Sequence, residues 1–128
     1  MEGDKIVHKD LSYKIVGVLY EVYNKLGYGY QEKYYQRAIE QEFSLLDINF
    51  SRQLPYSIKF KGEIIGRYFL DFLVEDKIVL EIKKGNHYSR RNIEQVLGYL
   101  KATNKQLAIL ANFTANGVKC LRILNVKS

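Results

Sequence analysis

The amino-acid sequence predicts one α/β domain in which helices flank a mixed sheet of about five strands. The first observation is the order of the periodic segments: two helices, three strands, a helix and two strands. The second is that one crossover helix separates the strands, so parallel and antiparallel pairs should share a sheet. The third is length, because 128 residues without a linker or repeat suffice for one core, and residues 1–128 are expected to form a single domain.

Two helices are expected before the first strand. Gly27 and Gly29 separate them, so the first should run from about residue 10 to 26 and the second from about 31 to 46. Residues 1–9 are charged, lack an apolar signal core and are expected to form a flexible N-terminal segment. The first helix is indicated by apolar residues at helical spacing: Leu11, Ile15, Val18, Leu19, Val22 and Leu26.

The strands and the third helix follow apolar runs bounded by turns. Pro55 lies in the first strand and indicates that this strand starts late or lies at a sheet edge. In the third helix, over residues 90–101, Gln95 and Tyr99 share a flank that faces away from the inward stripe of Ile93, Val96, Leu97 and Leu100. The strands are expected at residues 53–60, 64–74, 77–83, 107–113 and 119–125.

The composition limits the classes of partner and compartment. A net charge of +6 and a pI near 9.3 favour polyanionic partners such as nucleic acid. The single cysteine, Cys120, excludes an intramolecular disulfide and is predicted to be a small buried side chain. No apolar run approaches the length of a membrane span, so no membrane partner and a cytoplasmic location are expected. The sequence contains no zinc-ligand spacing, glycine-rich phosphate loop or serine-nucleophile elbow.

Asp71, Glu81 and Lys83 interrupt segments that otherwise read as buried strand. A buried charge must be paired or bind a metal. Glu81 and Lys83 are two residues apart on one strand and therefore point to the same face. Two carboxylates and a lysine converging there would suit a divalent cation and a phosphate. A structural salt bridge at the sheet margin is the competing interpretation.

The turn between these two strands decides whether Asp71 faces Glu81. If the loop contains residues 75–77, Val74 pairs with Ile78 and Asp71 falls opposite Glu81. A two-residue loop would instead pair Asp71 with Leu80 and place Glu81 on the other face. The metal-site interpretation requires the longer loop or an equivalent bulge.

Other charged residues extend the candidate site. Glu32 opens the second helix at the margin of its apolar stripe, where it could lean over the sheet edge or simply favour the helix dipole. Lys84, Arg90 and Arg91 cluster with Lys83 before the third helix and are candidate contacts to a phosphate backbone. An ordinary solvated charge run is the alternative. His87, in the same loop, reads as a surface histidine.

Several short motifs in this order resemble the GxxExxY family, a branch of the PD-(D/E)XK nuclease superfamily. Gly29, Glu32 and Tyr35 match the fixed positions of the naming motif. Leu70-Asp71 followed by Glu81-Ile82-Lys83 is similar to the superfamily core, with Leu70 in place of its proline. Gln95 and Tyr99 match a QxxxY element of exonuclease-type members. Similar proteins often carry a histidine where this chain has Asn92.

The resemblance implies a restriction-endonuclease-like core and a nuclease that depends on Mg²⁺ or Mn²⁺. It implies Glu32, Asp71 and Glu81 as metal ligands, Lys83 as a catalytic residue, and Gln95 and Tyr99 as residues lining the site. The expected reaction is hydrolysis of phosphodiester bonds in nucleic acid, with DNA favoured over RNA, and the small size is compatible with a homodimer around a duplex. The alternative is a catalytically inactive nucleic-acid-binding or protein-interaction module with the same fold.

Overall fold

The computed structural model describes residues 6–86 and 88–126 of the chain. Within these ranges the predicted order of helices and strands is confirmed. The first strand begins earlier than predicted, at Phe50, and the first helix begins at Lys9, while residues 1–5 of the predicted N-terminal segment lie outside the described part. The elements are α1 (Lys9–Leu26), α2 (Glu32–Leu45), β1 (Phe50–Phe60), β2 (Glu63–Val74), β3 (Ile78–Lys84), α3 (Arg90–Thr103), β4 (Leu107–Thr114) and β5 (Gly117–Leu124).

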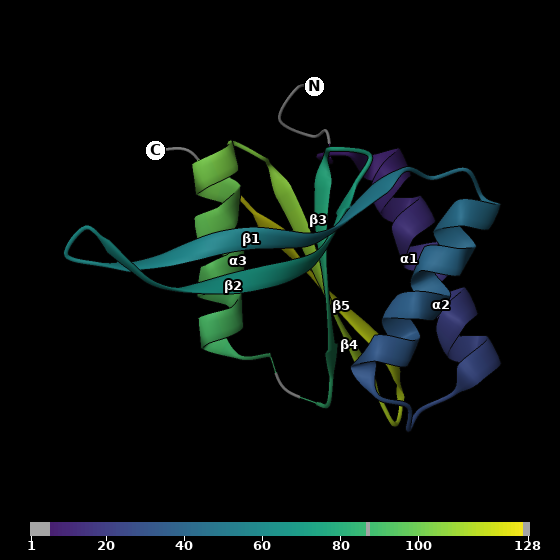
Figure 1. The fold of residues 1–128 in the computed structure, drawn as a ribbon. Helices are drawn as coiled ribbons and strands as arrows, with labels where there is room; N and C mark the ends of the chain where they lie inside the picture. The colour runs from purple at the N-terminus through teal and green to yellow at the C-terminus, as the bar shows by residue number, and fades with distance from the viewer. Residues whose placement is uncertain (1–5, 87, 127–128) are drawn as a thin grey trace.

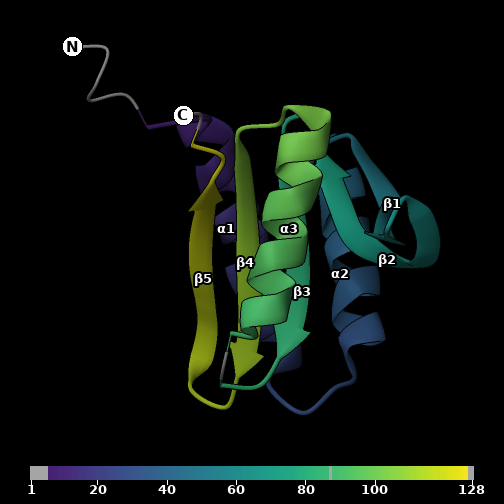
Figure 2. The same cartoon turned by 90° about the vertical axis from the view of Figure 1, so that its left-hand side faces the viewer.

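The described strands form one mixed sheet in the order β1-β2-β3-β4-β5. β3 and β4 are parallel and are connected through α3, whereas the other neighbouring strands are antiparallel. α3 covers one face of the sheet, and α1 and α2 cover the other (Figures 1 and 2). This arrangement is the predicted α/β fold with a mixed five-stranded sheet.

Two hydrophobic clusters fill the two interfaces between helices and sheet. Ile78, Leu80 and Ile82 of β3 belong to the cluster beneath α1 and α2. Val79, between them in sequence, belongs to the cluster beneath α3. Because side chains alternate along a strand, Glu81 lies on the same side of β3 as Val79, toward α3. Neither face of β3 is solvated, which explains its near-continuous apolar sequence.

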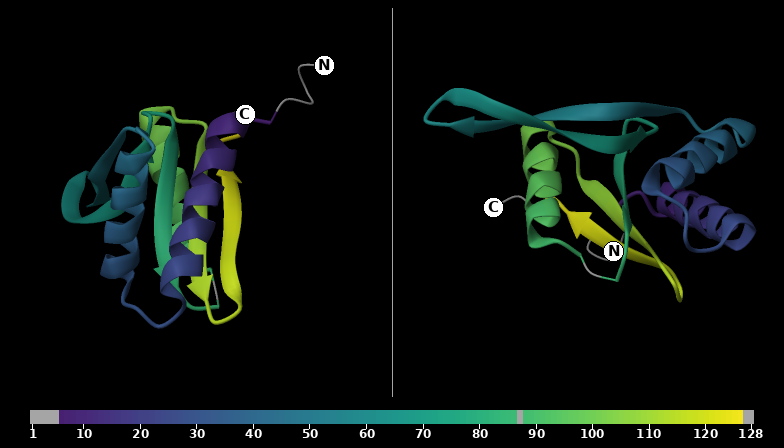
Figure 3. Two further views of the ribbon diagram at one scale, coloured as in Figure 1. Left: turned by 90° about the vertical axis from the view of Figure 1, so that its right-hand side faces the viewer. Right: turned by 60° about the horizontal axis from the view of Figure 1, so that its bottom comes forward.

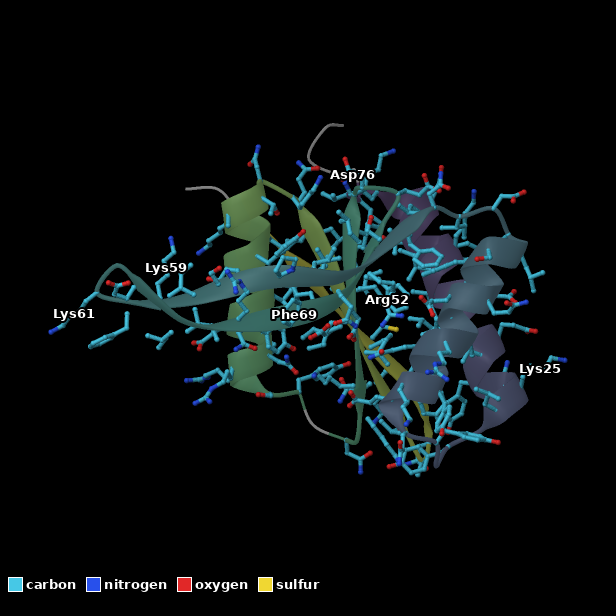
Figure 4. All side chains as sticks on the ribbon, in the orientation of Figure 1. Lys25, Arg52, Lys59, Lys61, Phe69 and Asp76 are labelled. Carbon is cyan, nitrogen blue, oxygen red and sulfur yellow. The ribbon has the colours of Figure 1, made fainter. Side chains whose placement is uncertain are left out.

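The β1–β2 hairpin extends beyond the rest of the sheet and crosses over α3 (Figures 1 and 3). β1 is an edge strand, as Pro55 predicts. Lys59 and Lys61 lie near the hairpin tip, far from the helices (Figure 4). Phe60, Ile64 and Ile65 are exposed in the same region. The hairpin therefore has an outer half that is exposed and an inner half that joins the core.

Cys120 is exposed rather than buried, because it lies on the edge strand β5, where only part of the chain is covered. No helix in the described ranges is long and apolar enough to span a membrane.

Candidate active site

The β2–β3 pairing follows the register of the longer loop. Val74 pairs with Ile78, Leu73 with Val79 and Phe72 with Leu80. This register confirms the three-residue connection and places Asp71 opposite Glu81 in sequence. The regular backbone pairing ends at Phe72 and Leu80, so Asp71 is the first residue of β2 beyond the ladder.

Carboxylates replace the backbone hydrogen bonds where β2 leaves β3. The backbone N–H of Asp71 donates to Oε1 of Glu81 over 2.9 Å, and the N–H of Ile82 donates to Oδ2 of Asp71 over 2.7 Å. The carbonyl oxygen of Asp71 accepts from Nε of Arg52 over 2.8 Å. Buried backbone groups need such partners. The two acidic side chains thus close the gap between the strands.

β2 also changes the face it presents at Asp71. Leu70 packs in the cluster beneath α3, whereas Phe72 packs in the cluster beneath α1 and α2. Residues two apart on a regular strand share a face, so the strand must twist sharply between them. Gln53, the residue of β1 opposite this point, has a φ of 58°, in the left-handed region. The distortion in both strands positions Asp71 between the two helical layers.

The two carboxylates are buried and lie beside each other. Asp71 is 9% exposed and Glu81 is 1% exposed. Burial, reinforced by the charge of Asp71, raises the pKa of Glu81 to about 8. Burial likewise raises the pKa of Asp71. Lys83 supplies one cation, with Nζ 4.0 Å from Oε2 of Glu81. The surroundings therefore do not compensate two ionised carboxylates, and a bound cation would stabilise their ionised forms.

A polar stripe on α2 faces this region. Gln36 donates through Nε2 to Oδ1 of Asp71 over 3.0 Å, and its Oε1 accepts from Arg52 over 2.9 Å. Glu40, one turn later, pairs with Arg52 at 2.9 Å. Arg52 also lies 4.4 Å from the centre of the Phe72 ring, on the side of the sheet that faces α2 (Figure 4). This stripe fixes Asp71 from the α2 side.

Glu32 begins the same stripe, one turn before Gln36. Its Oε2 accepts from the backbone N–H of Lys84 over 3.0 Å, three residues beyond Glu81 on β3. Residues four apart on a helix are neighbours on one face, so Glu32 lies next to the residue that contacts Asp71. In the described ranges, no three His, Cys, Asp or Glu side chains are gathered closely enough to hold a metal. Glu32 is thus bonded to the end of β3 and lies one helical turn from the residue that contacts Asp71.

Two residues on the α3 side hold Glu81, and sequence reasoning missed this role for both. The hydroxyl of Tyr68 donates to Oε2 of Glu81. Nδ2 of Asn92 in turn donates to the Tyr68 hydroxyl over 2.5 Å. Ser89 caps α3 by accepting from the N–H of Asn92 over 3.4 Å, which fixes the first turn of the helix. The polar chain from Asn92 through Tyr68 orients Glu81.

Gln95 and Tyr99 line a groove between α3 and β1 instead of an outward flank. The prediction that both face away from the apolar stripe is wrong for Tyr99, which is 8% exposed and packs in the α3 cluster. The reason is the hairpin, which covers this side of the helix. Gly98 permits the contact, since a Cβ there would overlap the Tyr56 ring of β1.

The predicted basic contacts lie at two places around the site. Lys84 is exposed at the end of β3, and its Nζ donates to the carbonyl of Gly29 over 3.4 Å. Arg90 and Arg91 are exposed at the start of α3, and Arg91 reaches the groove that contains Gln95. His87 lies outside the described residues. The three cations therefore lie at the end of β3 and at the start of α3.

Comparisons with known proteins identify the family of the chain and relatives of its fold. The PD-(D/E)XK nuclease superfamily model matches residues 9–123. The chain is similar to the crystal structure of SSO0001, with a TM-score of 0.54 and 16% identity over 73% of this chain and 50% of that chain. It is also similar to an alkaline exonuclease from Laribacter hongkongensis, with a TM-score of 0.48 and 15% identity over 68% of this chain and 52% of that chain.

The structural neighbours are distant and larger, since this chain spans about half the length of each. The likeness to SSO0001 is one of fold. No curated protein matches the chain significantly. The family match, in contrast, covers nearly the whole sequence and includes every element of the candidate site. The chain belongs to the PD-(D/E)XK nuclease superfamily.

Proposed function

We propose that this protein is a Mg²⁺- or Mn²⁺-dependent nuclease that hydrolyses phosphodiester bonds in nucleic acid, with DNA favoured over RNA. The observation that carries the proposal is the buried carboxylate pair, Asp71 and Glu81, with Lys83 beside it, at the point where β2 leaves β3. Nucleases of this superfamily generally use divalent metal ions. The basic charge of the chain suits a polyanionic substrate.

The donor set fits a hard divalent cation. Asp71 and Glu81 offer four carboxylate oxygens, each of which accepts a hydrogen bond and keeps a further lone pair. Oxygen ligands of this kind suit Mg²⁺ and Mn²⁺. Glu32, one helical turn from Gln36, is the proposed third ligand and would exchange its bond to Lys84 for the metal. The bound ion would lower the pKa of a water ligand and neutralise charge on the phosphate.

The remaining residues act on the substrate. Lys83 places an ammonium beside Glu81, where it can orient the attacking water and stabilise negative charge on the phosphoryl oxygens. Gln95 and Tyr99 would orient the scissile strand from the α3 groove. Lys84, Arg90 and Arg91 would contact neighbouring phosphates, since they are exposed on either side of the pair. A homodimer around a duplex would bring two such sites to opposite strands.

Membership of the GxxExxY branch is part of the proposal, because each motif position has a separate task. Gly29 has a φ of 122°, a conformation that favours glycine. Tyr35 is fully buried, and its hydroxyl donates to the carbonyl of Gly27 over 2.5 Å, which fixes the turn. Glu32 lies between these two supports at the first position of α2. The motif thus holds Glu32 against the end of β3.

A second candidate is a nucleic-acid-binding module that does not cut. The observation in its favour is that every oxygen of Asp71 and Glu81 already accepts a hydrogen bond from the chain itself. The carboxylate pair therefore has a structural task that does not depend on a metal.

Cleavage of a panel of labelled single-stranded and double-stranded DNA and RNA, with Mg²⁺, Mn²⁺ or EDTA, separates the two candidates. Asp71→Asn, Glu81→Gln and Lys83→Ala should each reduce cleavage by about 100-fold or more. Glu21→Gln and Lys101→Ala, which change exposed residues elsewhere, are the matched controls and should cut normally. Equal cleavage by wild type, Asp71→Asn and Lys83→Ala would refute the assignment. Salt-dependent binding without metal-dependent cleavage would establish the binding module.

A further inference from the structure

We propose that Tyr28, Tyr30 and Tyr34 form a stacking platform for unpaired nucleobases beside the candidate active site. This set is called the tyrosine platform below. The proposal rests on the nuclease function and deepens it, because it selects single-stranded segments or frayed ends as the substrate. The three residues lie in the turn between α1 and α2 and in the first turn of α2, outside the fixed positions of the GxxExxY motif.

The platform residues are exposed together. Tyr28, Tyr30 and Tyr34 are 44%, 46% and 44% exposed. The Tyr30 and Tyr34 rings meet edge to face, with centroids 6.3 Å apart. Exposed large aromatic rings that cluster on a surface commonly mark a binding site. Aromatic side chains also present flat apolar faces on which any base can stack.

The turn that carries the platform is held in place from below. The buried Tyr35 ring lies 6.1 Å from that of Tyr30 at an interplanar angle of 83°, and its hydroxyl bonds the carbonyl of Gly27. Lys84 bonds the carbonyl of Gly29 from the end of β3. These contacts fix the backbone of the turn before a ligand arrives. A pre-organised surface loses less conformational entropy on binding.

Two lysines give the platform the charge that a nucleic-acid strand requires. Nζ of Lys84 lies 5.3 Å from the centre of the Tyr28 ring, and Nζ of Lys33 lies 5.2 Å from that of Tyr34. Ammonium groups beside aromatic rings combine phosphate attraction with base stacking. A duplex hides the faces of its bases within the helical stack, so this combination favours unpaired bases.

β3 links the platform to the carboxylate pair. Lys84 follows Lys83 directly, and its backbone N–H donates a hydrogen bond to Glu32. Along β3, Glu81 and Lys84 are three residues apart, which corresponds to about 10 Å. A strand whose phosphate lies at Asp71 and Glu81 would therefore place the bases of adjacent nucleotides within reach of the tyrosines. The lower end of β3 and the α1–α2 turn lie at the same end of the molecule (Figure 1).

Binding in EDTA tests the platform without requiring cleavage. Fluorescence anisotropy would measure the binding of labelled dT12, U12 and a blunt 12-base-pair duplex at one salt concentration. The proteins compared are wild type, the triple variant, and the single variants Tyr28→Leu, Tyr30→Leu and Tyr34→Leu. The triple variant should bind dT12 or U12 at least about 10-fold more weakly and bind the duplex within about 2-fold of wild type. If the triple variant loses binding to dT12 alone, the ligand is DNA, and if it loses binding to U12 alone, the ligand is RNA.

Two controls make the result specific. Tyr13→Leu removes a tyrosine that is 82% exposed near the start of α1, and it should bind all three ligands as wild type does. The triple Phe variant keeps the rings and should retain single-strand binding, and it remains informative where the triple Leu variant does not fold. Unchanged binding by the Leu variants, an equal loss with the duplex, or no single-strand binding by wild type would overturn the platform. None of these outcomes alters the cleavage result, so the two proposals fail separately.

Discussion

The two ends of the β2–β3 pair are built from different chemistry. At the closed end, Phe72, Leu73 and Val74 pair through the backbone with Leu80, Val79 and Ile78, and every side chain is apolar and buried. At the open end, Asp71 and Glu81 replace the ladder with side-chain hydrogen bonds to backbone N–H groups. One end satisfies the backbone by regular pairing, and the other by carboxylates.

This difference explains how a charged pair can persist in the sheet. A strand that diverges from its neighbour leaves donors unpaired, and each buried unpaired group costs about 1–3 kcal/mol. Asp71 and Glu81 remove that penalty and place two carboxyl groups side by side at the gap. The closed end therefore supports stability, and the open end supports stability and, in the proposed function, the binding of a cation.

The largest effect is expected at the closed end, with Leu80→Ala. Leu80 is fully buried beneath α1 and α2, so its truncation leaves a cavity and should lower the free energy of unfolding by about 2–5 kcal/mol. Urea titration measures this loss. Lys83→Ala, at the open end, is the matched control and should change stability by less than about 1 kcal/mol while reducing cleavage. An equal loss of stability in both variants would remove the proposed division between the ends.

The next effect is stabilisation by metal at the open end. Mn²⁺ at about 100 times its Kd should raise the free energy of unfolding by about 2.7 kcal/mol at constant pH. Thermal unfolding of wild type and Asp71→Asn, with Mn²⁺ and with EDTA, measures the difference. Asp71→Asn should show little of the shift. A shift of the same size in that variant would place the ion elsewhere.

Arg52→Ala should destabilise the open end alone. It removes the donor to the carbonyl of Asp71, the ion pair with Glu40 and the contact with the Phe72 ring. We expect a loss of about 1–3 kcal/mol in the free energy of unfolding, together with weaker Mn²⁺ binding by calorimetry. Lys105→Ala, which breaks a pair with the exposed Asp76, is the control for loss of a cation. Unchanged metal affinity in Arg52→Ala would separate this network from the site.

The pH dependence of stability should report the charge at the open end. The folded protein holds the Glu81 proton more tightly than the unfolded chain, because the pKa rises from 4.5 to about 8. The contribution of Glu81 is therefore fully present below about pH 4.5 and is lost as the pH rises to about 8. The free energy of unfolding of wild type and of Glu81→Gln would be measured by denaturation without metal across this pH range. The difference between the two proteins isolates the contribution of Glu81. A difference that is flat between these limits would contradict the raised pKa.

The smallest effect is expected from Tyr68→Phe, which removes one hydroxyl from the open end. The loss of its bonds with Glu81 and Asn92 should lower the free energy of unfolding by about 0.5–1.5 kcal/mol. Cleavage should rise with pH as Glu81 loses its proton, since a metal ligand must be deprotonated. The Tyr68 hydrogen bond lowers the pKa of Glu81, so its removal should shift this rise to higher pH. Tyr23→Phe, which loses a bond to Thr114 on α1's side of the sheet, is the control and should leave the profile unchanged. An unshifted profile in Tyr68→Phe would show that Tyr68 only supports the fold.

The sequence predicted the elements, because local periodicity determines them. It left the facing of Asp71 and Glu81 dependent on the length of one loop, and the structure has the longer of the two alternatives. It did not reveal Arg52 or Tyr68, whose partners are 19 and 13 residues away along the chain. Gln36 had a readable signal, since it follows Glu32 by one helical turn. The burial of Tyr99 depends on how far the hairpin extends over α3. Helical spacing does not indicate this tertiary contact.

The hydrogen bonds that Asp71 and Glu81 accept from backbone N–H groups affect how this fold would change during evolution. A lineage that stopped cutting nucleic acid would still need both carboxylates to join β2 to β3. Lys83 holds no backbone group among its described contacts, so mutation would remove it first. Across homologous sequences, a lysine at this position would distinguish working enzymes from inherited scaffolds better than the acidic residues that name the superfamily.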